Sequence, residues 1–406
     1  MAEDNKVYLD YQSAKPVDPE VLEAMKPYML EKFGNASSLH EIGDMSTEAL
    51  EESRKTIGQF INAEHPEEEI IFTSGATESN NLALIGFAMR NSKKGKHVII
   101  SEVEHISIHN IAKNLQKNGL EVSKVPVDFT GTVRLDKLEE RIRSDTILIS
   151  IQYASNEIGT IQPIAEIGRI AHERGITFHV DAVAAEGQVP IDVQADNIDL
   201  LTLSSNDIYG PRGVGVLYAR KGVLLNPIII GGGQERGLRS GTEDVAGIVG
   251  MAKAAEISMR VMSDESARLQ QLRDKAIQQV LEIVPKSHLN GHKENRLPNN
   301  AHFRFDYIEG ESILISFKNL GLAVSTGSAC SSKTLEPSHT LMSLGLLHEE
   351  AHGSLEITLG RWTTEADIDR FLEVLPGIVE RLRAMSPLTK RETLEDTCAP
   401  QENQDI

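Results

Sequence analysis

Apolar runs of strand length alternate with amphipathic runs of helix length between residues 96 and 219, and this alternation constrains the fold most. Strands separated by helices of this length pair in parallel, and the helices cover both faces of the sheet. The sequence therefore predicts an α/β fold with a mostly parallel central sheet. Strands are predicted over 96–101, 120–126, 146–151, 176–180, 198–203 and 214–219, and helices over 106–118 and near 163–174.

The pattern changes near residue 250, where one long helix is predicted over 252–283. Fewer strands follow, near 300–305 and 354–358. A last helix is predicted from Thr364 to about Met385, because Thr364-Glu-Ala-Asp367 has the sequence of a capping box.

This change divides the chain. We predict a large domain over residues 15–258 and a smaller α+β domain formed by residues 1–14 and 259–386. Residues 387–406 are polar and lack periodicity, so we predict a disordered tail there.

Composition limits the partners and the setting. The net charge is −19, from 41 basic and 60 acidic side chains, which argues against nucleic acid and anionic membranes because phosphate binding needs clustered Lys and Arg. No apolar stretch approaches the roughly 18 residues of a spanning helix. The polar N-terminus does not have the pattern of a signal peptide. Cys330 and Cys398 are the only cysteines and form no C-x-x-C pair, so a reducing cytoplasm is the predicted location.

Two segments have the features of an anion or ligand site. In residues 73–81, a glycine turn leads small hydroxyl side chains into a helix predicted over 80–90, and free N–H groups at a helix start favour an anion. Taken alone, this segment fits a plain N-capped helix better. Asp181 ends a buried strand, where a carboxylate is costly unless it is paired.

Three loops complete the pattern. Residues 204–215 form a polar loop at the carboxyl end of a buried strand, where α/β proteins hold ligands. The glycines of residues 231–242 suit backbone that passes close to a ligand. Cys330 lies in the Ser/Gly-rich segment 324–332, which predicts an accessible thiol whose neighbours favour the thiolate.

Together, these segments resemble the NifS/IscS-type cysteine desulfurases of the class-V aminotransferase family, over about Val7 to Met385. The resemblance implies the pyridoxal phosphate (PLP)-dependent fold type I, which is aspartate-aminotransferase-like. It also implies a homodimer that takes sulfur from L-cysteine and delivers it to an IscU-type scaffold of iron–sulfur cluster assembly.

The resemblance also implies roles in holding the cofactor. The phosphate is expected at Ala76 and Thr77, and Asp181 is expected to pair with the pyridinium nitrogen. His105 is expected to stack on the ring and to take part in proton transfer. The further cofactor-binding residues implied are Asn156, Ala184, Ser204, Asn206 and, from the neighbouring subunit, Thr242.

On the substrate side, the resemblance implies that Cys330 attacks the sulfur of the substrate and becomes a persulfide. Arg361 matches the family arginine that binds the α-carboxylate, where a bidentate fork suits the geometry. Asn35 matches a further substrate-side residue.

Two departures from the family pattern fall on the same side of the cofactor ring. Asp207 replaces the lysine that forms the Schiff base, and Ala184 replaces a glutamine that bonds the phenolic oxygen. A carboxylate cannot form an imine. We therefore expect PLP, or its amine form pyridoxamine phosphate (PMP), to bind without a covalent bond. Asp207 is expected to pair with an amine or to act as a general base.

Three functions follow from these motifs. The first is a cysteine desulfurase that works through a persulfide on Cys330. The second is a desulfurase-inactive homologue that binds PLP or PMP and uses Cys330 as a sulfur relay, or as a ligand to a transient [2Fe–2S] cluster shared with the scaffold. The third is another class-V PLP transferase or lyase. The Ser-Ala-Cys-Ser segment and Arg361 count against the third.

Overall fold

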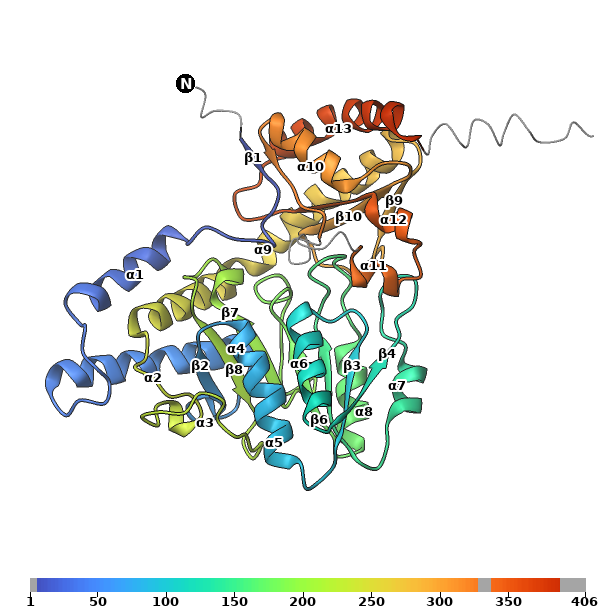
Figure 1. Cartoon of the computed structure of the whole chain (residues 1–406). Helices are drawn as coiled ribbons and strands as arrows, with labels where there is room; N and C mark the ends of the chain where they lie inside the picture. Colours follow the sequence, from blue (N-terminus) through green and yellow to red (C-terminus); the bar gives the residue numbers. More distant parts are fainter. Residues whose placement is uncertain (1–5, 328–336, 388–406) are drawn as a thin grey trace, which may run out of the picture.

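The computed structural model describes residues 6–327 and 337–387. Its main element is a seven-stranded sheet with the order β2-β8-β7-β6-β5-β3-β4 (Figure 1). β8 is antiparallel to both of its neighbours, and the other neighbouring pairs are parallel. The strands are β2 (Ile70–Thr73), β3 (His97–Ser101), β4 (Glu121–Val125), β5 (Thr146–Gln152), β6 (Thr177–Asp181), β7 (Leu200–Ser204) and β8 (Gly215–Ala219).

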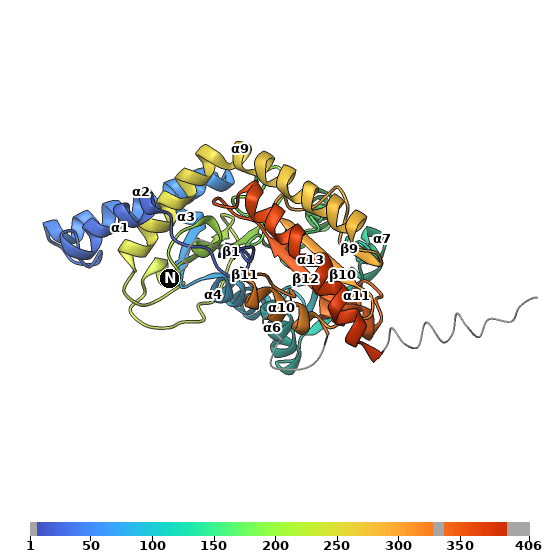
Figure 2. The ribbon, with the colours of Figure 1, turned by 90° about the horizontal axis from the view of Figure 1, so that it is seen from above.

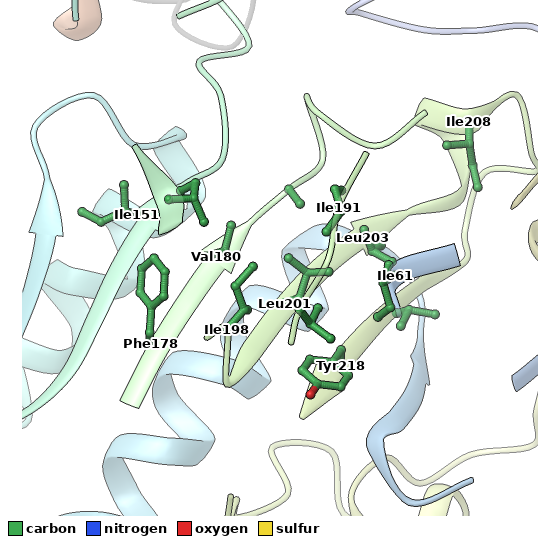
Figure 3. Packing of buried hydrophobic residues seen from close by; sticks show 14 of the residues in the cluster. Ile61, Ile151, Phe178, Val180, Ile191, Ile198, Leu201, Leu203, Ile208 and Tyr218 are labelled. Atoms are coloured by element: carbon green, nitrogen blue, oxygen red, sulfur yellow. The ribbon is translucent and has the colours of Figure 1, made fainter. Parts of the chain in front are cut away.

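The central strands are buried on both faces. Every residue of β3, β5, β7 and β8 is buried. Successive side chains of a strand point to opposite faces, so Ile99 of β3 joins one apolar cluster while Val98 and Ile100 join another. Figure 3 shows the first cluster, in which Leu201 of β7 lies between its register partners Val180 of β6 and Tyr218 of β8.

Helices cover the two faces and confirm the predicted α/β layers. Side chains of α2, α8 and α9 pack in the cluster of Figure 3, and those of α5 and α6 pack in the other. The helix predicted over 80–90 begins earlier, as α4, and continues through a π-helical turn, Leu82–Gly86, into α5. The helices of this part are α1 (Pro19–Leu30), α2 (Glu41–Ile61), α3 (Pro66–Glu69), α4 (Ala76–Asn81), α5 (Phe87–Asn91), α6 (Ile106–Lys117), α7 (Leu135–Arg141) and α8 (Ile164–Glu173).

A single helix, α9 (Val245–Ile283), runs from the large sheet to the second part of the molecule (Figure 2). Its 39 residues span about 58 Å at 1.5 Å per residue. Its first turns are buried in the cluster around the large sheet, whereas Leu269, Ala276 and Val280 are buried in a separate cluster. The helix starts before the predicted residue 252, because the Asp244 side chain accepts a hydrogen bond from the Gly247 N–H and caps it.

The second part is built on a three-stranded antiparallel sheet, β9-β10-β12. β1 pairs in parallel with β11, so the N-terminal segment shares the cluster formed by residues 269–382. The division into two domains near residue 258 stays a prediction. The elements are β1 (Val7–Tyr8), β9 (Ser287–Asn290), β10 (Asn300–Phe305), β11 (Leu322–Ala323), β12 (Ser354–Thr358), α10 (Gly310–Asn319), α11 (His339–Ser343), α12 (His348–His352) and α13 (Glu365–Met385).

The predicted elements of the second part are confirmed. β10 and β12 have the predicted bounds, and Thr364 forms the predicted capping box at the start of α13. Across the described ranges, no helix combines the length and the apolar character needed to cross a membrane. The predicted disordered tail lies outside the described residues, apart from residue 387.

Candidate active site

A cavity of about 280 Å³ lies at the carboxyl ends of the parallel strands. β5 ends at Gln152 and β6 ends at Asp181, and both residues line the cavity. This edge of an open α/β sheet is where ligands bind. The lining residues are Gln12, Ser13, Ala76, Thr77, Asn80, His105, Ser107, Gln152, Ala154, Asn156, Asp181, Val183, Ala184, Asn206, Asp207, Ser325, Gly327 and Glu356.

Asp181 is held in place by a network of hydrogen bonds. Its Oδ2 accepts a bond of 2.8 Å from Asn80 Nδ2, and its Oδ1 accepts one of 3.2 Å from the Val183 N–H. Asn80 Nδ2 also lies 3.2 Å from Ser107 Oγ, which is 2.8 Å from His105 Nδ1. The network therefore fixes a carboxylate and an imidazole in one cavity.

The first turn of α4 forms another wall. Ala76 and Thr77 line the cavity directly after Gly75, whose φ of 140° is unfavourable for any residue with a side chain. A Cβ on Gly215 would meet the Gly75 Cα at 2.6 Å, so both positions need glycine. The turn therefore brings the start of a helix, where N–H groups favour anions, to the cavity.

Asp207 also lines the cavity. It lies in a short 3-10 helix, Ser205–Ile208, that follows β7, and its side chain lines the cavity although the residue is only 6% exposed. Burial raises the pKa of Asp207 above its ordinary value, and the Lys15 ammonium opposes that rise. Asn206 also lines the cavity, and its buried Oδ1 has no hydrogen-bond partner among the described residues.

The structure brings a lysine to this site that the sequence analysis missed. Lys15 Nζ donates a hydrogen bond of 2.5 Å to the main-chain oxygen of Asp207. Lys15 is 4% exposed and is not among the residues that line the cavity. It precedes Pro16 in a segment without periodicity, and no local signal separates it from an exposed lysine.

Four of the predicted site residues lie outside the cavity lining. Ser204 is buried and its N–H donates to Glu186 Oε1 at 2.7 Å. Thr242 and Asn35 are exposed. Arg361 binds two carboxylates of its own chain, Asp18 at 2.6 Å and Glu265 at 2.8 Å.

The segment that carries Cys330 starts at the cavity. Cys330 itself lies outside the described residues, as does Cys398. Ser325 and Gly327 line the cavity, and three residues span at most about 11 Å of extended chain. Gly327 has a φ of 74°, and a Cβ there would lie 2.5 Å from Glu157 Cγ, so this start of the segment needs glycine. Among the described residues, no group of three or more His, Cys, Asp or Glu side chains is arranged to hold a metal ion.

Three buried carboxyl groups that line the cavity or lie beside its lining residues were also missed. Glu356 lines it, and burial followed by the charge of Glu157 raises its pKa well above the ordinary value. Burial raises the pKa of Glu157 to about 7 and that of Glu104 to about 8. These groups therefore hold protons at a pH where exposed carboxyls are charged.

The buried Glu104 makes stability depend on pH. Between its ordinary pKa of 4.5 and about 8, the unfolded chain has lost this proton and the folded chain retains it. Stability is therefore lost as the pH rises through this window, by about 1.36 kcal/mol per pH unit. In Glu104→Gln, the Oε1 can still accept from Ser101 Oγ and the Gln152 N–H. We expect the free energy of unfolding in urea to fall less between pH 5 and pH 8 in this variant.

The control is Glu166→Gln, on the exposed first turn of α8. It is expected to keep the pH slope of the unaltered protein. Equal slopes for Glu104→Gln and the unaltered protein would show that Glu104 is ionised in the folded state.

The cavity fits PLP, the cofactor that the resemblance implies. Asp181 offers a carboxylate, and the α4 turn offers a helix start for a phosphate. Two buried acceptors, Asn80 Oδ1 and Asn206 Oδ1, lack partners among the described residues and are available to a ligand. The lining contains no lysine or arginine among the described residues.

Comparison with known proteins agrees with these features. Residues 7–371 match the family model of the class-V aminotransferases. The chain is 60% identical over 384 residues to cysteine desulfurase IscS 1 of Archaeoglobus fulgidus, covering 95% of this chain and 100% of that protein. It is 52% identical over 390 residues to cysteine desulfurase IscS of Methanosarcina thermophila, covering 96% of each.

Solved structures show the same fold. A NifS-like protein superposes with a TM-score of 0.87 at 36% identity, covering 93% of this chain and 100% of that chain. A NifS-like protein from Rickettsia africae superposes with a TM-score of 0.83 at 31% identity, covering 92% and 99%. With the sheet, the cavity and these full-length similarities, the chain belongs to the NifS/IscS-type cysteine desulfurases of the PLP-dependent class-V aminotransferase family.

Proposed function

We propose that this protein moves sulfur from L-cysteine to a scaffold of iron–sulfur cluster assembly through a persulfide on Cys330, with PLP bound non-covalently. One observation carries the proposal. The cavity that holds Asp181, His105 and Asn156 also contains Ser325 and Gly327, the start of the Cys330 segment. The proposal requires the thiol on that segment to reach a substrate in the cavity and then an acceptor outside it.

Bound PLP supplies an electron sink that weakens bonds at the carbon atoms of an amino acid. The protein supplies position and protons. Asp181 would pair with the ring nitrogen and favour its protonated form, and His105, hydrogen-bonded to Ser107, would be in place to move a proton at the substrate. Asp207 binds the ammonium of the incoming amino acid.

Transfer of sulfur from L-cysteine to Cys330 needs no further reactant. The Cys330 thiol loses its proton and attacks the sulfur atom of L-cysteine. The C–S bond of the substrate breaks, its carbon skeleton takes up the proton and leaves as alanine, and Cys330 retains the sulfur as a persulfide. Release of that sulfur as sulfide then requires an added thiol reductant or an acceptor protein.

A desulfurase-inactive role is the second candidate, and one observation favours it. Among the described residues, no amine lines the cavity, and Asp207 occupies the position that the resemblance assigns to the family lysine. In that role, PLP or PMP stabilises the site, and Cys330 passes on sulfur or binds a [2Fe–2S] cluster with the scaffold.

We also propose a homodimer in the cytoplasm. The hairpin between α1 and α2 projects from the large sheet in Figure 1, and Leu30, Phe33 and Leu39 on it are 75%, 66% and 103% exposed. Apolar side chains gathered in this way mark interaction surfaces. Exposed Thr242 is then available to the site of the second copy. A monomer in sedimentation experiments with bound cofactor would contradict this assembly.

The function is tested by anaerobic release of alanine and sulfide from L-cysteine, with PLP and a thiol reductant present. We expect release by the unaltered protein and by Cys398→Ala, and none by Cys330→Ala. Release that survives in Cys330→Ala would rule out the persulfide route. A silent unaltered protein that binds PLP would favour the inactive role.

A further inference from the structure

Lys15 contacts the main chain of the loop that carries Asp207. Its Nζ donates to the main-chain oxygen of Asp207 at 2.5 Å, and the Asp18 N–H donates to the main-chain oxygen of Tyr209 at 2.9 Å. The segment from Lys15 to Asp18 therefore runs along the loop from Asp207 to Tyr209. Tyr209 has a φ of 65°, a backbone conformation that few residues with side chains adopt. Its ring centroid lies 5.2 Å from Lys15 Nζ.

A buried ammonium needs an opposite charge. Burial lowers the pKa of Lys15. The negative charges of Asp207, Glu186 and Glu265, in that order, raise it, and the positive charge of Arg361 lowers it. Glu265 already binds Arg361 at 2.8 Å. The counter-charge of Lys15 is therefore supplied by Asp207 or Glu186.

Glu186 is the weaker candidate for that charge. It is fully buried, and burial followed by the charge of Asp207 raises its pKa well above the ordinary value. Its Oε1 accepts from the Ser204 N–H, whereas its Oε2 has no partner among the described residues. Burial therefore disfavours a charge on Glu186, and Asp207, whose main-chain oxygen Lys15 contacts, is the stronger candidate.

Burial raises the pKa of Asp207, the Lys15 ammonium lowers it, and the charge of Asp181 raises it further. Loss of the Lys15 charge would therefore favour the protonated form of Asp207. We propose that Lys15 is a positioning residue that fixes the Asp207 peptide and supplies the positive charge that keeps Asp207 ionised in the cavity. This inference rests on the proposed function, because it assigns Asp207 the task of binding an amine.

The consequence is a preference for amine-bearing ligands. Asp207 lines the cavity and Lys15 does not, so a ligand meets the carboxylate and not the ammonium. An ionised Asp207 favours the ammonium of PMP or of an amino acid over the aldehyde of PLP. Lys15 therefore acts on ligands through Asp207.

The test is a double-mutant cycle on binding, which needs no turnover. The dissociation constants of PMP and of PLP are measured by equilibrium dialysis from pH 6 to pH 9, for the unaltered protein, Lys15→Met, Asp207→Asn and the double variant. We expect Lys15→Met to weaken PMP binding about tenfold or more, with a smaller effect on PLP. We expect the double variant to bind PMP as tightly as Asp207→Asn alone does.

Two variants distinguish the effect of the Lys15 charge from that of its hydrogen bond to the Asp207 main-chain oxygen. Lys15→Gln keeps a donor for the Asp207 oxygen without the charge and is expected to lose PMP affinity as Lys15→Met does. Lys15→Arg keeps the charge and is expected to retain the affinity. The single tryptophan, Trp362, lies 5.3 Å from the Tyr209 ring, so its fluorescence reports whether each variant folds correctly around this loop.

An equal loss of PMP binding with and without Asp207 would overturn the proposed role of Lys15. Borohydride trapping of PLP on Lys15, detected by peptide mass spectrometry, would also overturn it, because Lys15 would then be the amine that bonds the cofactor. An unaltered protein that binds neither PLP nor PMP would overturn the proposed function itself.

Discussion

Replacing Asp207 with lysine is expected to bond PLP covalently to the protein and to raise alanine release from L-cysteine. Asp207 lines the cavity and follows β7 through one short turn, so an amine introduced there enters the same space. A lysine also acts as a proton carrier, and general acid–base catalysis contributes about 10²–10⁴-fold to a rate. We expect a gain of that order in the rate of alanine release.

Lys15 assists this gain. The introduced amine would lie near the Lys15 ammonium, which is buried against the same peptide. Two neighbouring cations in a buried site disfavour the charged form of each, so the pKa of the introduced lysine falls toward neutral pH. A neutral amine is the form that reacts with an aldehyde.

The measurements are borohydride reduction, which fixes the cofactor to the protein for mass spectrometry, and the rate of alanine release. The matched control is Asp207→Asn, which removes the charge without adding an amine and is expected to gain neither property. An Asp207→Lys variant that folds and binds PLP but forms no covalent bond would show that position 207 does not face the reactive carbon.

Replacing Asp181 with asparagine is expected to weaken PLP binding by about 10³-fold. A carboxylate and a pyridinium about 4 Å apart attract each other by roughly 4 kcal/mol at an effective dielectric of about 20, and each 1.4 kcal/mol is a factor of ten in binding. Asparagine has one acceptor oxygen, so it can keep the hydrogen bond from either Asn80 Nδ2 or the Val183 N–H, but not both, and it removes the charge. The expected loss is therefore mainly electrostatic and includes one hydrogen bond.

The dissociation constant of PLP is measured by equilibrium dialysis at neutral pH. Asp199→Asn is the control, because Asp199 lies next to the opposite end of β7, where it accepts from the Phe178 N–H, and is outside the cavity. It is expected to leave PLP binding unaltered. A change of less than threefold in Asp181→Asn would place the ring nitrogen away from this carboxylate.

Local sequence signals predicted the elements that build the site. Polar and apolar residues alternate at 300–305 and 354–358, and the strands predicted there match β10 and β12. A hydroxyl three residues before a carboxylate predicted the start of α13. Strand β2 and helices α1 and α2 were not predicted, and β2, with four residues, is too short to show a clear period. The predicted start of α9 is too late. Most residues of its first turns are buried, so these turns lack the one-sided apolar stripe that marks a helix at the surface.

The residues of the site also divide into those that the sequence predicted and those that it did not. The family resemblance predicted Asp181 and Asp207 at one site. Both line one cavity, because β6 ends at Asp181, Asp207 follows the parallel strand β7, and parallel strands end at one edge of a sheet. Lys15 and Glu356 join them from segments far away along the chain, and Glu186 joins them from the turn after β6, through burial that no local pattern records. Arg361 and Asn35 were expected at the substrate, but the cavity of a single chain does not contain them.

Residues close together in the chain were therefore sufficient to predict the α/β architecture and the family, and the resemblance to that family predicts a carboxylate in place of its lysine. The charges that surround this carboxylate depend on the tertiary structure. Lys15 and Asp207 are 192 residues apart and meet only because the N-terminal segment runs along the Asp207 loop. The ionisation of a buried group depends on such neighbours in space, and so does the chemistry that the cavity can perform.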